Sequence, residues 1–182
     1  YPTAIYSSPI QRAKDTAIAL ATAWHTAHPT RPPLPIQDHP DLREFQNGVF
    51  QGLTWAEARQ QYPELCDRLE SSPSWIPIPQ AETLADGRER AKRFIERVVT
   101  QHQAGDRVCI VTHHWILQQL VSVLMGCDRT WGFAADYTAR FEFRLNPAFW
   151  NATDQNRWNS DLWQIVRFGD RAHWPHTHSQ RD

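Results

Sequence analysis

The sequence predicts an α/β fold, with helices on both faces of a largely parallel sheet in a three-layer α/β/α sandwich. Short apolar runs typical of strands alternate along the chain with longer segments whose apolar residues recur at helical spacing. Two of these runs, Thr3 to Ser7 and Arg107 to Thr112, lead directly into helical segments. An alternation of this kind is typical of layered domains built on parallel strands.

The first element is a strand over Thr3 to Ser7, because the sequence TAIYS is apolar and partly β-branched. We expect the helix that follows to begin with Ser8 as N-cap, Pro9 at the first helical position and Gln11 closing a capping box. The proline-rich segment from Pro29 to Pro40 ends this helix and supplies an extended segment. The apolar face of the helix consists of Ile10, Ala13, Ala17, Leu20, Ala21 and Trp24.

The middle of the chain contains two further helix starts, separated by a loop. Thr54-Trp55-Ala56-Glu57 is a second capping box and predicts a helix that runs towards Tyr62. The segment from Ser71 to Gln80 contains three prolines and predicts an irregular surface loop. Thr83 and Asp86 then begin a helix whose apolar face is Leu84, Ala91, Phe94, Ile95 and Val98.

The last third of the chain begins with a strand, Arg107 to Thr112, which looks buried. It runs directly into an apolar helix from about His114 to Met125, which Gly126 closes as the C-terminal glycine. Two later runs, Ala139 to Leu145 and Leu162 to Phe168, alternate or are apolar enough to form strands.

The composition is that of one globular domain, with 182 residues of which 41% are hydrophobic and 21% charged. The formal net charge is −1 and the basic residues are scattered among acidic ones, which argues against nucleic acid as a partner. No apolar run reaches the roughly 20 residues that span a bilayer, so we expect no membrane partner, and we recognise no signal-peptide leader. Three widely spaced cysteines without metal-ligand spacing favour a reducing, cytoplasmic location: Cys66, Cys109 and Cys127.

Two strand ends deliver basic residues to helix starts. Arg12 lies in the first turn of the first helix, and His113 lies between the strand ending at Thr112 and the next helix. Ligands of open α/β sheets bind at the carboxyl ends of strands, and helix N-termini favour phosphate. Because the guanidinium fork also matches phosphate oxygens, Arg12 and His113 together predict a phosphate cradle. Taken singly, such an arginine is more often a solvated surface charge, and such a histidine a hydrogen-bonded structural residue.

Glu44 is the candidate proton donor. It lies in the segment from Asp41 to Gly52, which contains two glycines and little periodicity and is therefore predicted to be a loop. A protonated carboxyl group beside a phosphate ester can pass its proton to the leaving alkoxide. From the sequence alone, an ordinary surface acid of the loop is the more common interpretation.

At these residues the chain resembles the histidine phosphatase superfamily, which is phosphoglycerate-mutase-like. The family elements, in chain order, are SSP-x-x-RA-x-x-TA, LxE-xxx-G-xxx-G, GES-x-x-D, V-[ST]-HG and a closing strand with its tail. Their counterparts here are Ser7 to Ala17, Leu42 to Gly52, Ala81 to Asp86, Val111 to His113, and Trp163 to His173. Order and spacing agree over nearly the whole chain, and the arginine element is the most specific of the five.

The resemblance implies phosphoryl transfer through a phosphohistidine. Arg12 and His113 stand at the family's phosphate-binding positions, and Glu44 stands at that of its proton donor, which makes these three the expected catalytic residues. His114 stands where the family has a glycine, and we expect it to contribute to phosphate binding. The family requires no metal, and neither a metal nor a cofactor is expected here.

One family element has no counterpart in this sequence. In the family, the nucleophilic histidine belongs to an Arg-His-Gly motif on a strand upstream of the arginine element, and this sequence begins at Tyr1. Gln51 also stands where an acid is common, and Ala81 where glycine is usual. We therefore expect residues 1–170 to form an N-terminally incomplete histidine phosphatase domain, followed by a flexible tail over residues 171–182.

The resemblance implies a phosphatase that hydrolyses a small phosphomonoester, with a small phosphorylated metabolite as its partner. The segment from Ser71 to Gln80 lacks the longer basic insertion expected of a full mutase, which favours hydrolysis over a phosphoglycerate-mutase-type phosphotransferase. A catalytically inactive, phosphate-binding remnant is the third possibility, because the nucleophile has no counterpart in the sequence.

Overall fold

The chain divides into two units, and each has its own secondary structure. This computed structural model describes residues 1–130, 132–150 and 163–174. The first unit comprises Tyr1–Val98 and Asp106–Trp131, and the second comprises Val99–Gly105 and Gly132–Asp182. All residues of the predicted site belong to the first unit.

A three-stranded parallel sheet organises the first unit. β1 (Ala4–Ser7) lies between β2 (Ile36–Asp38) and β3 (Val108–Val111). Ser7, the last residue of β1, is in register with Asp38 of β2 and Val111 of β3, so the three strands end at the same edge. The predicted parallel sheet is confirmed, and its carboxyl edge is where the candidate site lies.

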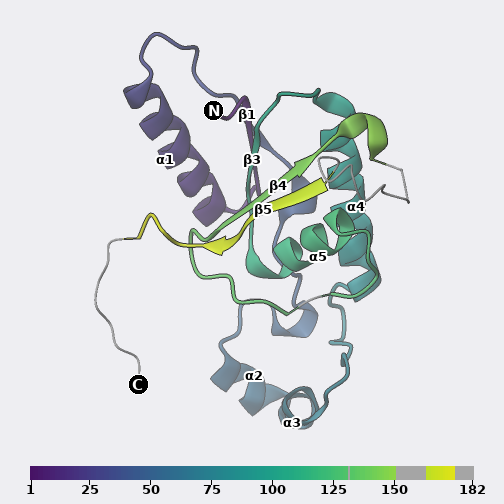
Figure 1. Cartoon of the computed structure of the whole chain (residues 1–182). Coiled ribbons are helices and arrows are strands. Elements are labelled where there is room, and N and C mark those ends of the chain that lie inside the picture. The colour runs from purple at the N-terminus through teal and green to yellow at the C-terminus, as the bar shows by residue number, and fades with distance from the viewer. Residues whose placement is uncertain (131, 151–162, 175–182) are drawn as a thin grey trace. The chain divides into compact units, whose positions relative to one another are not determined.

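Helices cover both faces of this sheet, with α1 (Gln11–Ala27) on one face and α4 (Leu84–Gln101) and α5 (His114–Leu124) on the other (Figure 1). All four residues of β1 are buried, and the ring of Tyr6 packs edge-on against Phe94 of α4, with centroids 5.5 Å apart. The predicted three-layer α/β/α arrangement is therefore confirmed in this unit.

The start of α1 differs from the prediction. Its N-cap is Ile10, which has an extended backbone and makes no side-chain capping bond, so the predicted capping box at Ser8 is wrong. The Ser8 hydroxyl accepts a hydrogen bond from the Ile10 N–H at 3.3 Å and lies 2.8 Å from Nε2 of His113. A contact with a residue far along the chain therefore occupies the oxygen that a cap would need.

The buried face of α1 is narrower than its apolar pattern suggests. Ala13 and Ala17 are buried, whereas Leu20, which belongs to the predicted apolar face, is 46% exposed. Small alanine side chains allow the helix to lie close to the strands.

α5 follows β3 directly, as the sequence predicts. Ile116, Leu120 and Val121 are buried on its apolar face. The helix ends at its C-cap Met125, and the next residue, Gly126, has a φ of +62°, which a glycine adopts without strain.

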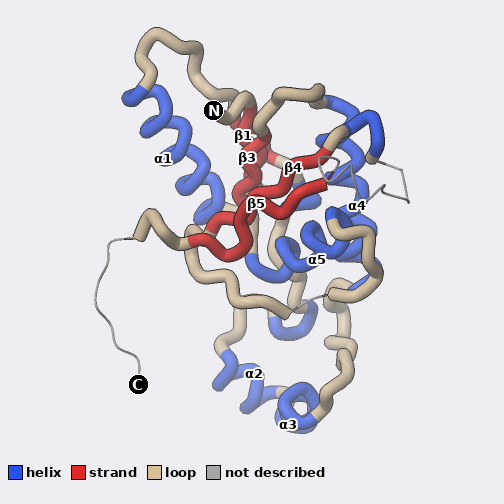
Figure 2. The backbone as a smooth tube through the Cα atoms, in the orientation of Figure 1, coloured by secondary structure: helices blue, strands red, loops and turns tan. Residues whose placement is uncertain are grey.

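Between β2 and α4 the chain forms two short helices, α2 (Trp55–Gln61) and α3 (Pro63–Ser71), which Figure 2 shows apart from the sheet. The capping box that starts α2 is confirmed, with both Thr54 and Glu57 making their reciprocal bonds. α3 is not predicted, although Pro63 at its first turn is a recognised start signal. The two helices share a small core formed by Phe50, Ala58 and Cys66.

Two 3₁₀ turns, Pro40–Leu42 and Gly48–Phe50, flank the loop that contains Glu44. Gly48 has a φ of +54°, and a Cβ atom there would lie 2.2 Å from the carbonyl oxygen of Pro79. Any other residue at this position would be strained and would also collide with that backbone, so glycine is required for the close approach of the two loops.

The second unit contains an antiparallel pair, β4 (Arg140–Leu145) and β5 (Trp163–Asp170), with a register shift along its length. Both strands were predicted, although Leu162, the first residue of the second prediction, lies outside the described residues. Three rings pack together in this unit: Phe133, Phe141 and Phe168. Residues 175–182 of the predicted tail lie outside the described residues, and both the tail and the 1–170 domain boundary stay predictions.

Candidate active site

The candidate site begins where β1 and β3 end side by side. The N–H of Ser8 donates to the carbonyl oxygen of Val111 at 2.9 Å, which extends the sheet pairing by one residue. The next turn of the chain after β3 places the ring of His113 against Ser8, and the two side chains are hydrogen-bonded. Ser8 is fully buried and His113 is 8% exposed. The residue that follows β1 therefore fixes the position of the imidazole.

Arg12 reaches the same histidine from the first turn of α1. Its Nε donates to Nδ1 of His113 at 3.2 Å, while the residue as a whole stays exposed and accessible to a ligand. A guanidinium group can only donate, so Nδ1 is the accepting nitrogen and the ring proton of the neutral form lies on Nε2, facing Ser8. The two predicted phosphate ligands are thus in direct contact.

The environment of His113 favours its neutral form. Burial lowers the pKa of the imidazole, the positive charge of Arg12 lowers it further, and the negative charge of Glu44 acts in the opposite direction. Burial and Arg12 thus favour the neutral imidazole over the imidazolium.

The side chain of Glu44 reaches from its loop to the start of α5, next to this pair. Its Oε1 accepts hydrogen bonds from the N–H of Phe45 at 3.0 Å and from the N–H of Trp115, in the first turn of α5, at 3.2 Å. Trp115 follows His113 by two residues, so this bond holds the carboxylate near the imidazole, and the negative charge of Glu44 acts to raise the pKa of His113. The structure therefore brings together Arg12, Glu44 and His113, which come from three separate segments of the chain.

His114 occupies a different position from these three. It is the first residue of α5, its side chain is exposed, and its Nε2 lies 3.3 Å from Nε2 of Gln118 one turn later. A contribution of His114 to phosphate binding stays a prediction.

Four further residues hold this site, and the sequence predicts a part in it for none of them: Ser8, Thr112, Arg90 and Glu82. Ser8 contacts His113, Thr112 donates to the carbonyl oxygen of Leu42, and Arg90 forms a buried ion pair with Glu82. Ser8, Thr112 and Glu82 lie inside the motifs that carry the family resemblance, and this was the signal that could have identified them. Arg90 is one of several arginines on α4, and nothing in the sequence distinguishes it from the others.

Among the described residues, no group of three or more histidine, cysteine, aspartate or glutamate side chains is placed to hold a metal ion. The helices within those residues include none that is both long enough and apolar enough to cross a membrane.

Comparison with known proteins identifies relatives of this chain. The sequence profile of the histidine phosphatase superfamily (branch 1) matches residues 1–158. The chain is 32% identical over 120 residues to the metal-independent phosphoserine phosphatase of Arabidopsis thaliana, covering 65% of this chain and 47% of the relative. It is 28% identical over 134 residues to phosphoserine phosphatase 1 of Hydrogenobacter thermophilus, covering 72% of this chain and 59% of the relative.

Among solved structures, Bacillus stearothermophilus YhfR has a similar fold. The TM-score is 0.69 at 24% identity, and the match covers 94% of this chain and 76% of that one. This similarity supports the fold alone. The chain spans about half the length of the two phosphoserine phosphatases that it matches, 47% and 59% respectively.

Proposed function

Because the chain belongs to the histidine phosphatase superfamily (branch 1), we propose that it hydrolyses a small phosphomonoester through a phosphohistidine intermediate. The observation that carries the proposal is the convergence of Arg12, Glu44 and His113 at the carboxyl ends of β1 and β3. A buried histidine and an accessible arginine can bind the phosphoryl oxygens, and a carboxyl group can protonate the leaving oxygen.

In this proposal each residue has a distinct role. Arg12 and His113 bind the equatorial phosphoryl oxygens, where negative charge spreads in the transition state. A neutral histidine attacks phosphorus, the P–N bond forms, and the P–O bond to the leaving group breaks as Glu44 protonates that oxygen. Water then attacks the phosphohistidine, releasing inorganic phosphate and the neutral imidazole, while the carboxylate of Glu44 recovers a proton.

We assign the attack to the histidine of an Arg-His-Gly strand, by resemblance to the family, and not to His113. His113 is 8% exposed, with both of its ring nitrogens engaged by Arg12 and Ser8. The coding sequence upstream of Tyr1 tests this assignment. An in-frame strand ending in Arg-His-Gly supports it, whereas unrelated sequence or a stop codon there favours a phosphate-binding protein without catalysis.

The activity test uses the full-length protein that contains this chain and a chromogenic aryl phosphate. We expect hydrolysis that Arg12→Ala abolishes, and retention of a phosphoenzyme that is labile to acid, as expected for phosphohistidine. Arg68→Ala, which removes an exposed arginine on α3, is the matched control and should keep full activity.

Other outcomes discriminate the alternatives. Thermal stabilisation by phosphate without turnover would contradict hydrolysis and identify a phosphate-binding protein. Transfer of the phosphoryl group to a second substrate oxygen, without release of phosphate, would identify a mutase-type phosphotransferase.

The proposed partner is a small phosphorylated metabolite, and O-phosphoserine is the first alkyl phosphate to test because both curated relatives above are named phosphoserine phosphatases. We also propose a cytoplasmic location. It is supported by the three cysteines, which are free of disulfides.

A further inference from the structure

The loop that leads into Glu44 is held by side chains from other elements. The backbone carbonyls of Asp41, Leu42 and Arg43 precede Glu44 directly, and each accepts a hydrogen bond from a side chain. Arg90 of α4 donates through Nη1 to the carbonyls of Asp41 and Arg43, at 2.7 Å in both cases. Thr112, at the end of β3, donates through Oγ1 to the carbonyl of Leu42 at 2.9 Å.

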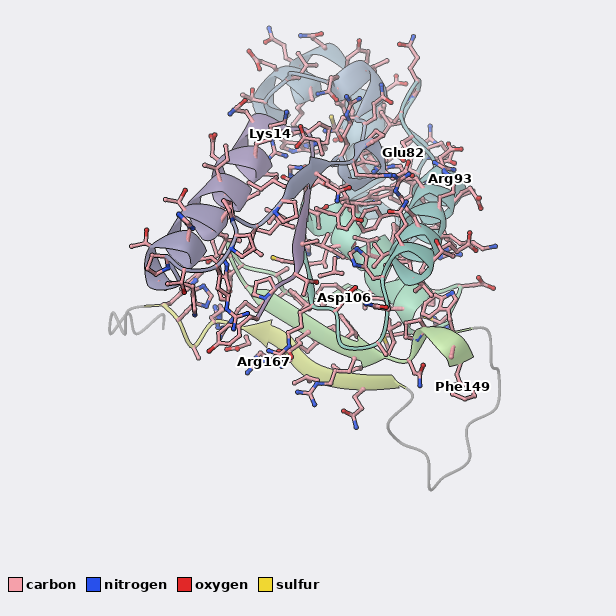
Figure 3. The ribbon with its side chains drawn as sticks, turned by 90° about the horizontal axis from the view of Figure 1, so that it is seen from above. Lys14, Glu82, Arg93, Asp106, Phe149 and Arg167 are labelled. Carbon is pink, nitrogen blue, oxygen red and sulfur yellow. The ribbon has the colours of Figure 1, made fainter. Side chains whose placement is uncertain are left out.

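Arg90 is itself fixed by Glu82, which Figure 3 labels just before α4. Nε of Arg90 donates to Oε1 of Glu82 at 2.5 Å, and Nη2 donates to Oε2 at 2.7 Å, so the pair is bidentate. The two side chains are only 11% and 9% exposed. Paired forks of this kind define the position of the guanidinium group more strictly than a single contact does.

The donors of Arg90 are almost fully committed within the protein. Of the five N–H groups of a guanidinium, one on Nε, two on Nη1 and one on Nη2 are used by Glu82 and the two carbonyls. Arg90 therefore differs from Arg12, which is exposed and contacts His113. Its arrangement suits the support of a loop and leaves little capacity to bind a phosphoryl group.

The same guanidinium group also contacts the residue that binds the Glu44 carboxylate. Its central carbon lies 5.8 Å from the ring centroid of Trp115, within the range of a cation–π contact. The backbone N–H of Trp115 donates to Oε1 of Glu44. Arg90 thus contacts the backbone immediately before Glu44 and also the residue whose N–H orients the carboxyl group.

We propose that Arg90, fixed by Glu82 and assisted by Thr112, is a positioning residue that sets the Glu44 carboxyl group for proton donation. This inference rests on the proposed function, in which Glu44 protonates the leaving oxygen. A proton donor must lie within hydrogen-bond reach of that oxygen, and a misplacement of about 1 Å can reduce the rate by about 10²-fold.

The test compares two esters that differ in their need for a proton donor. An alkyl phosphate such as O-phosphoserine releases a poor leaving group that requires protonation, whereas 2,4-dinitrophenyl phosphate releases a stable phenolate without it. In the full-length protein, Glu44→Gln should lose kcat/KM, which reports the step that releases the leaving group, on the alkyl ester and keep most of it on the dinitrophenyl ester. We expect Arg90→Lys, Glu82→Gln and Thr112→Val to show the same selective loss, of about 10- to 100-fold.

Two variants serve as controls for the proposal. Arg93→Gln removes an arginine that lies three residues further along α4, is more exposed, and bonds to the side chain of Asp41 instead of its carbonyl. It should leave the ratio of the two kcat/KM values unchanged. Thr112→Ser keeps a hydroxyl group at the same position and should recover the ratio that Thr112→Val loses.

The possible outcomes separate the two levels of inference. Equal losses on both esters in Arg90→Lys and Thr112→Val, accompanied by a lower melting temperature, would reduce these residues to a structural role and overturn the positioning proposal. A selective loss in Glu44→Gln that none of the other variants shares would also overturn it, while leaving the proposed function in place. Wild-type protein that hydrolyses neither ester would overturn the proposed function and this inference with it.

Discussion

His113 illustrates how one hydrogen bond fixes both the charge and the tautomer of a residue. Arg12 donates to Nδ1, so that nitrogen carries a lone pair, and the ring proton on Nε2 points to the Ser8 oxygen. Burial and the arginine both lower the pKa of the ring below 6.5. A doubly charged anion placed between Arg12 and His113 acts in the opposite direction, because it favours the protonated imidazole.

We predict that anion binding takes up a proton at His113. Sulfate is a suitable ligand because its own charge does not change near neutral pH. Its affinity should rise as the pH falls below neutrality. It should level off below the pKa of His113 in the ligand-free protein, which burial and Arg12 lower, since protonation then precedes binding. Isothermal titration calorimetry in buffers of different ionisation enthalpy measures the proton uptake directly. His113→Asn should abolish the pH dependence, and the exposed His25→Asn should not; the same slope in both variants would argue against this role.

Gly87 is a second position where one atom decides the local arrangement. It is buried in α4, and a Cβ atom there would lie 2.0 Å from the Trp115 ring. Gly87→Ala should therefore displace Trp115 and destabilise the fold by about 1–3 kcal/mol, the usual cost of overpacking. Urea unfolding gives the value. Gly132→Ala, where the added Cβ meets no atom within 4 Å, is the control, and an equal loss there would contradict the steric explanation.

At the scale of elements, local sequence signals succeed where the local chain satisfies them. The Thr54 box starts α2 as predicted, because Thr54 and Glu57 form their hydrogen bonds with each other. The apparently similar signal at Ser8 fails because its hydroxyl is bound to His113, more than 100 residues away. A capping motif therefore predicts a helix start only when no tertiary contact takes its oxygen.

We expect Thr54→Ala to destabilise α2 by about 1 kcal/mol, because the Thr54 hydroxyl accepts from the Glu57 N–H and donates to the Glu57 carboxylate, and both bonds would be lost. Amide hydrogen exchange should become faster in α2 and α3, which share a core. Thr16→Ala is the control, since the Thr16 hydroxyl bonds to a carbonyl within α1 and caps nothing. Unchanged exchange in Thr54→Ala would mean that packing alone defines the start of the helix.

The sequence predicts the layers of the fold and three of the site residues, but not the network that orients them. Strand and helix patterns depend on neighbouring residues and are visible along the chain, and Arg12, Glu44 and His113 lie in recognisable motifs. The role of Arg90 depends on carbonyl groups about 50 residues earlier. Every residue has a carbonyl group, so the sequence contains no signal for which of them an arginine will bind.

At the scale of the whole molecule, the sheet of the first unit has two edges, β2 and β3. Within the described residues β3 pairs with β1 alone, although its position places His113 at the site. An unpaired strand edge is a template for association with other chains. The resemblance to the family predicts one further strand, which carries the nucleophilic histidine.

We therefore predict that residues 1–182 alone are less soluble and less stable than the same chain preceded by the family's Arg-His-Gly strand. Light scattering during thermal unfolding should show aggregation of the shorter chain and not of the longer one. A sharp, reversible unfolding transition for residues 1–182 alone would contradict this prediction.

The close approach of two loops at Gly48 brings together the two ends of the segment that contains α2 and α3. The N–H of Val49 donates to the carbonyl of Pro79, and that of Glu82 donates to the carbonyl of Gln46, each at 3.0 Å. The segment between these points, which contains α2 and α3, therefore begins and ends at the same place within the first unit. Because closing a longer or shorter loop changes the free energy only slightly, we predict that insertions or deletions within this segment are tolerated while Glu44 keeps its place.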